Sequence, residues 1–504
     1  MAGINMRGWR ISTKILVVLL AALVASAVAG CANSAGSGEK ITDGIRDIIT
    51  TSESGNNTAL KEYAGRGTPA PVALESLVSP SQGPSQFDPA RAADTDIVTV
   101  DMGYQVKVTG QRSGSVKSIF GGREPEVVIT TLIPKTIEGK QRVLEIEFSV
   151  EPSQVYDVDE SRYAEFTVRN PEGDFDINIR TKLELFRYDV STARNAGRAA
   201  PLGETERAAF LKDEKYIEKD HPAIQEAARS IQGTDDEGTV KKIYEFVVEE
   251  LEYDKAKAGS ETGKAYGAAN ALGLGKGVCV EYTDLFVALC RAKGIPAKYV
   301  GGIPTEGESL GKGHAWAEVY VPNYGWVPSD PTWGDTGAVT FDRLRPSYVY
   351  LTDVRNDEVL RNSDIYTCQY IGLDVDISHS LNVDSARTKY LAELRSSIDT
   401  KKSKLEQLRK GLDTTFATIK SSEAEINRID QEMAGVRREL QTSASLGQAE
   451  HNRLVEKYNS LVNSYNEKLA LHNQRVNAYQ SERDFYEAER AEINAVVDRY
   501  NLLK

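Results

Sequence analysis

The last quarter of the chain limits its fold most strongly, because residues 384–504 contain no proline and repeat apolar side chains every seven residues. Heptads sustained over this length predict a coiled coil. A stretch of small residues, 443–447, interrupts them, so we expect an antiparallel hairpin whose arms are each about 80–90 Å long at ~1.5 Å per residue. The two rows are Leu391, Ile398, Leu405, Leu412, Ile419, Ile426, Met433 and Leu440, and then Tyr458, Tyr465, His472, Tyr479, Tyr486, Ile493 and Tyr500.

The charge balance excludes one class of partner. The chain has 61 lysine and arginine residues against 74 aspartate and glutamate residues, a formal net charge of −13. Because nucleic-acid binding needs clustered cations, we expect no nucleic-acid partner. The apolar seam of the predicted hairpin leaves two alternatives open: a coiled-coil partner or homo-oligomer, or pairing within the chain alone.

The first 31 residues read as an export signal. Basic residues precede an apolar run over 15–28, which is short for a membrane span of ~20 residues. The run ends in Val28-Ala29-Gly30-Cys31, which resembles the lipobox of prokaryotic lipoproteins, so we expect a lipid on Cys31. A plain signal peptide and an uncleaved anchor are the alternatives, and all three place the protein outside the cytoplasm. Residues 32–93, rich in small and polar residues, are expected to be a flexible linker.

Two globular segments lie between this linker and the hairpin. Residues 94–200 alternate apolar and polar side chains, as in the run of Ile177, Ile179, Thr181, Leu183 and Leu185, which predicts a β-sandwich-like domain. Residues 205–380 begin with helical periodicity and continue with strand candidates at 297–300 and 314–321. We therefore expect an α+β core in this second segment.

One cysteine in the second segment has the setting of a nucleophile. A thiolate is stabilised by a helix N-terminus and by a neighbouring imidazole, and Cys279 opens the apolar-faced helix that follows Gly277. His314 starts a predicted strand 35 residues later, and Asp330 follows after another 16 residues. A carboxylate at this place would hold His314 in the useful tautomer, and Asp335 is its competitor for that role. The other histidines are His221, His379, His451 and His472, beside loop residues or in the predicted coiled coil.

These residues fall in stretches that resemble the transglutaminase-like superfamily. The matching stretches are residues 275–286 (GKGVCVEYTDLF), 290–302 (CRAKGIPAKYVGG), 314–320 (HAWAEVY) and 330–334 (DPTWG). The resemblance covers residues 205–380. It implies a papain-like core in which Cys279 is the nucleophile, His314 the acid-base and Asp330 its orienting partner. The overall expectation is an α+β chain with this core after the sandwich and before the hairpin at 384–504.

The resemblance also implies an activity. The Cys279 thiolate would attack an amide carbonyl of a protein or peptide, and water or an amine would resolve the thioester, giving hydrolysis or acyl transfer. The oxyanion would lie near the backbone N–H of Cys279. No metal or other cofactor is expected. The alternative is a non-catalytic surface adaptor that uses the fold for peptide binding and the hairpin for assembly.

Two further questions stay open from the residues alone. Trp316 and Trp333 lie close to His314 and Asp330 in sequence, where they would form either a substrate-binding wall or the core of a small sheet. Cys290 is expected to be a core residue. It lies ~16 Å along the helix from Cys279, too far for a disulfide, and a bridge to Cys368 is not favoured.

Overall fold

The computed structural model describes residues 70–78, 86–111, 124–190, 199–258, 265–306, 312–322, 324–334, 343–361, 363–442 and 447–503. The predicted export signal with Cys31 and most of the predicted linker lie outside these residues. Within the described ranges, no helix combines the length and the apolar character that a membrane crossing requires.

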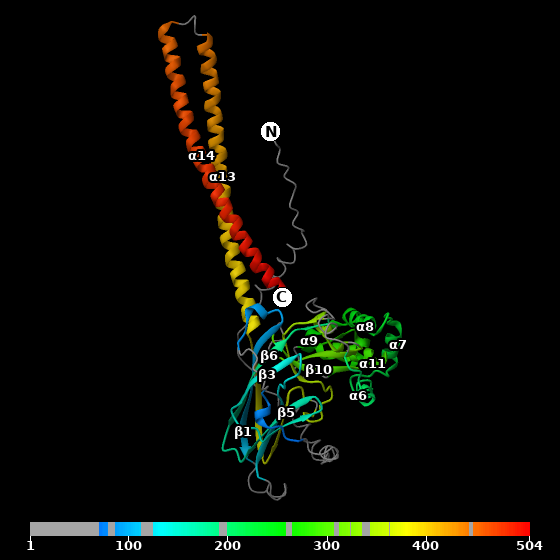
Figure 1. Ribbon diagram of the computed structural model, residues 1–504. Helices are drawn as coiled ribbons and strands as arrows, with labels where there is room; N and C mark the ends of the chain where they lie inside the picture. Colours follow the sequence, from blue (N-terminus) through cyan, green and yellow to red (C-terminus); the bar gives the residue numbers. More distant parts are fainter. Residues whose placement is uncertain are drawn as a thin grey trace. The chain divides into compact units, whose positions relative to one another are not determined.

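The alternating segment after residue 94 forms two four-stranded antiparallel sheets whose apolar faces pack against each other (Figure 1). One sheet has the order β16-β1-β6-β3 and the other β15-β2-β5-β4. The inward side chains of the predicted run, Ile177, Ile179, Leu183 and Leu185, are buried in the shared core, as period two requires. The strands are β1 (Thr95–Gln111), β2 (Glu126–Leu132), β3 (Gln141–Phe148), β4 (Gln154–Val158), β5 (Ser161–Arg169), β6 (Phe175–Phe186), β15 (Tyr366–Ile371) and β16 (Leu373–Ser385).

Two strands of this sandwich, β15 and β16, come from the last residues of the segment predicted as the α+β core (205–380) and the few residues after it, which corrects that predicted range. β15 pairs with β2, and β16 pairs with β1 in a register that runs from Val98 opposite Ser385 to Gln111 opposite Leu373. The chain therefore leaves the sandwich after β6, builds the α+β core, and returns to complete both sheets. Strand pairing between distant segments is decided by tertiary packing, so periodicity alone could not assign β15 and β16 to the sandwich.

The α+β core is a four-stranded antiparallel sheet, ordered β12-β11-β10-β14, with helices on one face (Figure 1). Its strands are β10 (Ala297–Pro304), β11 (His314–Val321), β12 (Gly325–Ser329) and β14 (Tyr348–Thr352). Helix α11 (Cys279–Ala292) is almost wholly buried between this sheet and the neighbouring helices. Those neighbours and the short elements are α6 (Glu204–Ala209), α7 (Pro222–Ser230), α8 (Asp236–Glu250), α9 (Lys255–Ala258), α10 (Ala268–Leu274), α12 (Pro331–Gly334), β7 (Tyr188–Asp189), β8 (Glu252–Tyr253), β9 (Lys276–Gly277), β13 (Arg343–Leu344), η1 (Leu74–Ser76) and η2 (Pro89–Arg91).

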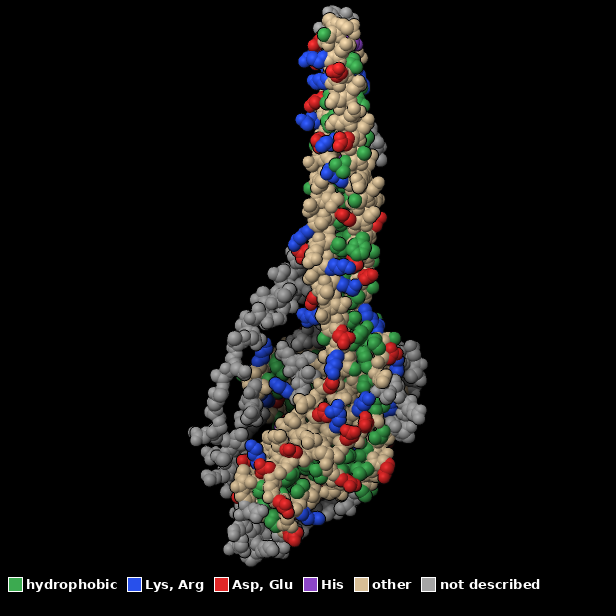
Figure 2. Space-filling model, turned by 90° about the vertical axis from the view of Figure 1, so that its left-hand side faces the viewer, with side chains coloured by type: hydrophobic (Ala, Val, Ile, Leu, Met, Phe, Trp, Pro, Cys, Tyr) green, Lys and Arg blue, Asp and Glu red, His purple; other side chains and the backbone are tan. Residues whose placement is uncertain are grey.

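The predicted hairpin consists of α13 (Ala386–Thr442) and α14 (Gln448–Leu503), which run side by side (Figure 1). Their seam buries members of the predicted rows, among them Ile398, Ile426, Met433 and Ile493. His472 is a polar member of the second row, and its Nδ1 lies 2.8 Å from Ser422 Oγ across the seam. Charged side chains of both signs alternate along the exposed faces (Figure 2), and some join the helices, as between Lys404 and Glu489 at 2.7 Å. The long antiparallel hairpin is confirmed.

We predict that Leu183→Ala lowers the free energy of unfolding by about 2–5 kcal/mol, because it leaves a cavity in the sandwich core. Its neighbour Lys182 lies on the polar side of the same strand, so Lys182→Ala should change stability by no more than about 0.5 kcal/mol. Urea denaturation followed by circular dichroism measures both. Equal costs for the two variants would contradict the observed inward and outward alternation.

Candidate functional site

Cys279 is the first residue of α11, and its neighbours explain why the helix begins there. Val278 is the N-cap residue, and its backbone N–H donates to Glu281 Oε2 at 3.0 Å. The first N–H groups of a helix have no partner within the helix, and the positive end of its dipole lies here. The thiol of Cys279 is partly exposed at this end, where a thiolate is stabilised and can be reached.

A buried charge pair fixes the loop that precedes Cys279. The fully buried Glu281 carboxylate accepts hydrogen bonds from Lys257 Nζ at 2.5 Å and from the backbone N–H of Tyr266 at 3.0 Å. Gly277 is needed because a Cβ at that position would lie 2.4 Å from the Cβ of Glu281. The space beside this glycine is therefore occupied by Glu281. Sequence reasoning missed Glu281 and Lys257, because nothing in their local pattern shows that they meet.

His314 is the first residue of β11, and Asp330 holds its ring. Nε2 of His314 donates to Oδ2 of Asp330 at 2.7 Å, and both side chains are buried. Since Nε2 is occupied in this way, Nδ1 is the ring nitrogen left for the Cys279 thiol, with which His314 also forms a hydrogen bond. The structure thus brings together the three residues that the sequence singled out, Cys279, His314 and Asp330.

Asp330 has all the partners that a buried carboxylate needs. Its Oδ1 accepts the backbone N–H groups of Thr332 at 3.1 Å and Trp333 at 3.3 Å, at the start of α12. Its Oδ2 accepts the hydroxyl of Tyr348 at 2.9 Å in addition to His314. These bonds hold the Asp330 carboxylate in one orientation. The alternative carboxylate, Asp335, lies outside the described residues.

The surroundings of His314 favour its charged form. Burial alone would lower the pKa of His314, but the Asp330 carboxylate raises it through charge and hydrogen bonding, and Cys279 adds to this, so that the pKa is about 10. His314 therefore remains an imidazolium throughout the neutral range. An imidazolium beside a cysteine sulfur is the arrangement in which cysteine enzymes activate their nucleophile.

The two tryptophans that were candidates for a substrate wall have different positions. Trp333 is partly exposed, and its ring stacks on His314 with centroids 5.0 Å apart. Trp316 is 0% exposed and packs against Tyr348 and Tyr350. Because a fully buried ring has no surface to offer a ligand, the substrate-binding expectation for Trp316 is wrong, and only Trp333 remains a candidate.

Tyr348 is a second residue that sequence reasoning missed. It begins β14, and besides its bond to Asp330 its ring contacts those of Trp316 and Trp333, with centroids 5.0 and 5.3 Å away. Its apolar neighbours in the sequence, the strand YVYLT, made it look like an ordinary core residue. Its role is visible only when β14 is placed beside β10.

The other two described cysteines differ from Cys279. Cys290 is fully buried on α11, and burial raises the pKa of its thiol far above the ordinary value. Cys368 is partly exposed on β15, and burial raises its pKa to about 11. Neither is in a disulfide. Both thiols stay protonated at neutral pH, so they serve as internal references for the reactivity of Cys279.

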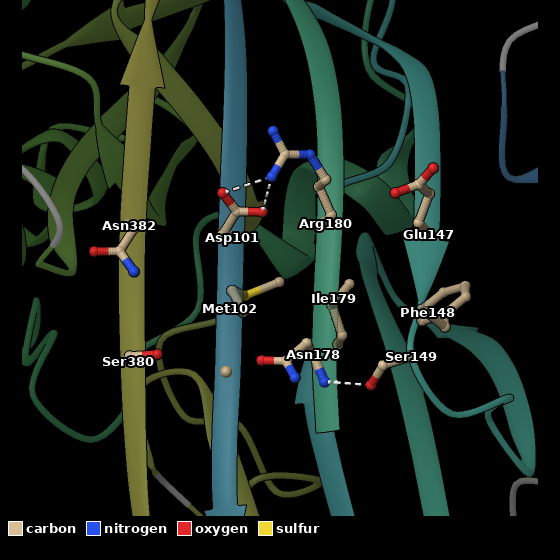
Figure 3. A pocket seen from close by; sticks show the side chains of 11 residues that line it. Asp101, Met102, Glu147, Phe148, Ser149, Asn178, Ile179, Arg180, Ser380 and Asn382 are labelled. Carbon is tan, nitrogen blue, oxygen red and sulfur yellow. Dashed lines mark hydrogen bonds and ion pairs between the residues drawn. The ribbon is translucent and has the colours of Figure 1, made fainter. Parts of the chain in front are cut away.

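A hollow of about 720 Å³ lies on the polar face of the sheet β16-β1-β6-β3, and none of its lining residues belongs to the site just described. Gly103 contributes to its depth, because a Cβ there would lie 2.7 Å from Ser380 Oγ. Some of the side chains around it bond to one another or to the backbone: Arg180 pairs with Asp101, and Ser149 accepts the backbone N–H of Asn178 (Figure 3). We assign no chemistry to this surface.

Comparison with known families places the site in a recognised domain. The model of the transglutaminase-like superfamily matches residues 225–331, a range that contains Cys279, His314 and Asp330. The chain is 37% identical over 79 residues to the uncharacterized protein YebA of Bacillus subtilis, which covers 13% of this chain and 11% of YebA. It is 31% identical over 109 residues to an uncharacterized protein of Haemophilus influenzae, covering 18% of this chain and 29% of that protein. The chain thus spans less than a third of either relative.

Two solved structures are also similar. A candidate cysteine protease from Cytophaga hutchinsonii has 17% sequence identity and a TM-score of 0.41, over 58% of this chain and 91% of that one. A candidate protease from Parabacteroides distasonis has 12% identity and a TM-score of 0.18, over 54% and 46% of the two chains. At these values we take nothing about activity from either structure.

We predict that iodoacetamide alkylates Cys279 at pH 6.5 at least about tenfold faster than an ordinary cysteine. An imidazolium that persists to a pH near 10 keeps the thiolate present, whereas a free thiol with a pKa of about 8.5 is protonated at this pH. In His314→Ala the rate should fall and then rise about tenfold per pH unit up to pH ~8.5. Peptide mass spectrometry between pH 5 and 10 measures both profiles.

Cys290 supplies the internal control for this experiment, because in the folded protein its buried thiol should stay unmodified. The thiolate–imidazolium pair would be contradicted if the alkylation rate of Cys279 followed the same pH profile with and without His314.

Proposed function

Because residues 225–331 form a transglutaminase-like domain in which a cysteine, a histidine and an aspartate meet, we propose that the protein is a cysteine enzyme acting on amide bonds of proteins or peptides. The single observation that carries the proposal is the contact of Cys279, at a helix N-terminus, with a histidine whose other ring nitrogen is held by Asp330 at 2.7 Å.

The proposed acylation step follows from this geometry. The Cys279 thiolate attacks the carbonyl carbon of an amide, and a carbon–sulfur bond forms while the π electrons move to the carbonyl oxygen. The backbone N–H of Cys279 at the start of α11 stabilises this oxyanion. The imidazolium of His314 gives its proton to the amide nitrogen, the carbon–nitrogen bond breaks, and an amine or ammonia leaves. The product is a thioester on Cys279 and a neutral His314.

The second step returns the enzyme to its starting state. Neutral His314 accepts a proton from water or from an incoming amine, which attacks the thioester carbon. The carbon–sulfur bond breaks, and the product is a carboxylic acid in the first case and a new amide in the second. Asp330 stabilises the imidazolium each time it forms, and the partly exposed Trp333, stacked on His314, is the side chain we propose to touch the acyl part of the substrate.

The proposed place of action is the outer side of the cytoplasmic membrane. The support for it is the sequence alone: a basic start, an apolar run over 15–28 and the lipobox-like ending at Cys31. An enzyme tethered by a lipid and a flexible segment would meet envelope or extracellular proteins as substrates. We propose such proteins as the substrate class.

We predict that incubation with a labelled primary amine and a panel of envelope proteins gives amine incorporation, deamidation or cleavage that Cys279→Ala abolishes. Cys368→Ala, a control at a partly exposed cysteine of the sandwich, should keep full activity. Mass spectrometry of the substrates distinguishes acyl transfer from hydrolysis. Full biological activity of both Cys279→Ala and His314→Ala would instead support the adaptor hypothesis.

A matched pair of variants tests the role of Asp330. Asp330→Asn keeps the size of the side chain but removes the charge that sustains the imidazolium, so we expect kcat to fall by about 10²–10⁴-fold. Tyr348→Phe removes only one hydrogen bond to the same carboxylate, and a loss of no more than about tenfold is expected. If Asp330→Asn retained wild-type kcat, the orienting role of Asp330 would be refuted.

A further inference from the structure

The base of the hairpin is fixed to the globular part of the chain by one buried arginine. We call this base the hairpin root and define it as residues 385–388 and 499–503. Arg387, in the first turn of α13, is only 2% exposed, although most of α13 is open to solvent. A buried guanidinium is costly unless its donors are bonded, so its partners show what the position is for.

The partners of Arg387 come from three separate parts of the chain. Its backbone N–H donates to Asp96 Oδ1 at 2.8 Å, and its Nε donates to the carbonyl of Ala92 at 3.0 Å. Its Nη1 binds Glu306 Oε2 at 2.9 Å, and its Nη2 binds the carbonyl of Leu503 at the end of α14. One side chain therefore ties both hairpin helices to the start of the sandwich and to the end of β10.

Glu306 continues the connection toward the site. While its Oε2 binds Arg387, its Oε1 accepts a hydrogen bond from Arg345 Nη1 at 3.1 Å. Beside it, the backbone carbonyl of Thr305 accepts the hydroxyl of Thr388 from the root at 3.1 Å. The Glu306 carboxylate is therefore held by two arginines, one on each oxygen, and the bond from Thr388 to Thr305 runs beside it. Together these bonds fix the position of residues 305 and 306 relative to the hairpin root.

The segment that carries Arg345 leads directly to Asp330. The N–H of Thr305 donates to the carbonyl of Ser347 at 2.9 Å, and Pro304 is opposite Tyr348 in the pairing of β10 with β14. The Tyr348 hydroxyl then donates to Oδ2 of Asp330, the oxygen that also accepts His314 Nε2. Every group on this route, from Arg387 to His314, belongs to the described residues.

We infer that Arg387 is a positioning residue, through which the seating of the hairpin root sets the orientation of Asp330 and, with it, the reactivity of Cys279. This inference rests on the proposed function. Its physical basis is that Tyr348 and His314 share one carboxylate oxygen, so a displacement of Tyr348 changes how strongly Asp330 holds the histidine. Helix α13 has 57 residues and is about 85 Å long at ~1.5 Å per residue. A force on its distant end therefore exerts a large torque on the hairpin root.

The test uses the full chain and the rate at which iodoacetamide alkylates Cys279, measured between pH 5 and 10. Two variants break the route without removing a large side chain: Arg387→Lys keeps the cation and loses the guanidinium, and Glu306→Gln keeps the shape and loses the charge. We expect each variant to lower the alkylation rate of Cys279 at pH 7 by about 3- to 10-fold. Each should also change how this rate depends on pH above 7.

A matched control lies in the same root. Arg499 binds the carbonyl of Pro89, and among the described residues no bond joins it to Glu306, so Arg499→Gln removes one contact of α14 while every bond on the route from Arg387 to Asp330 stays in place. Its alkylation rate should stay within about twofold of wild type. Thermal unfolding followed by circular dichroism verifies that all variants are folded at the assay temperature; if Arg387→Lys is not, Glu306→Gln alone decides the outcome.

Double variants test whether the effect passes through Tyr348. If it does, Glu306→Gln combined with Tyr348→Phe should react no more slowly than Tyr348→Phe alone, because the shared step is already lost. Three results would each overturn the inference. The first is that the effects of Glu306→Gln and Tyr348→Phe on the alkylation rate multiply in the double variant. The others are an unchanged pH profile of alkylation in folded Glu306→Gln, and an effect of Arg499→Gln as large as that of Glu306→Gln. If instead wild-type Cys279 reacts no faster than Cys279 in His314→Ala, the proposed function itself fails.

Discussion

The site depends on one buried hydrogen bond, between Nε2 of His314 and Oδ2 of Asp330 at 2.7 Å. A buried imidazolium without a counter-charge would lose its proton, because burial lowers the pKa of histidine. Asp330 reverses this, and it can do so because its own oxygens are held by Tyr348 and by two N–H groups at the start of α12. The nucleophilic role proposed for Cys279 therefore rests on a carboxylate that is itself fully buried.

Three different elements of the fold supply the three side chains of the site. Helix α11 brings Cys279 to its N-terminus, β11 supplies His314, and the turn after β12 supplies Asp330. Antiparallel pairing of β11 with β10 and β12 sets the positions of the last two. The α+β core is inserted into the sequence of the sandwich. Strands before it, β1 and β2, pair with strands after it, β16 and β15. Through β16, the hairpin is a direct continuation of the sandwich.

Local patterns were sufficient to predict much of this. Period two predicted the buried face of β6, and heptads predicted α13 and α14. The resemblance of four stretches to the transglutaminase-like superfamily implied that Cys279, His314 and Asp330 meet. What failed or was missed depends on tertiary packing. The burial of Trp316, the hydrogen bond from Tyr348, and the contact of Glu281 with Lys257 all arise between segments distant in sequence. The periodicity of one segment does not show which distant segment it will contact. The pairing of β15 and β16 with the first strands of the sandwich is a further example.

The most direct measurement is the titration of His314 by heteronuclear NMR, with the ring nitrogens of histidine labelled with ¹⁵N. We predict that His314 keeps both ring protons from pH 6.5 to about 9 and titrates near pH 10, and that Asp330→Asn lowers this midpoint. Assignment of the signal by comparison with His314→Gln makes the result specific. A neutral His314 ring at pH 7, with a midpoint at or below the ordinary 6.5, would contradict the charged pair on which the proposed chemistry is built.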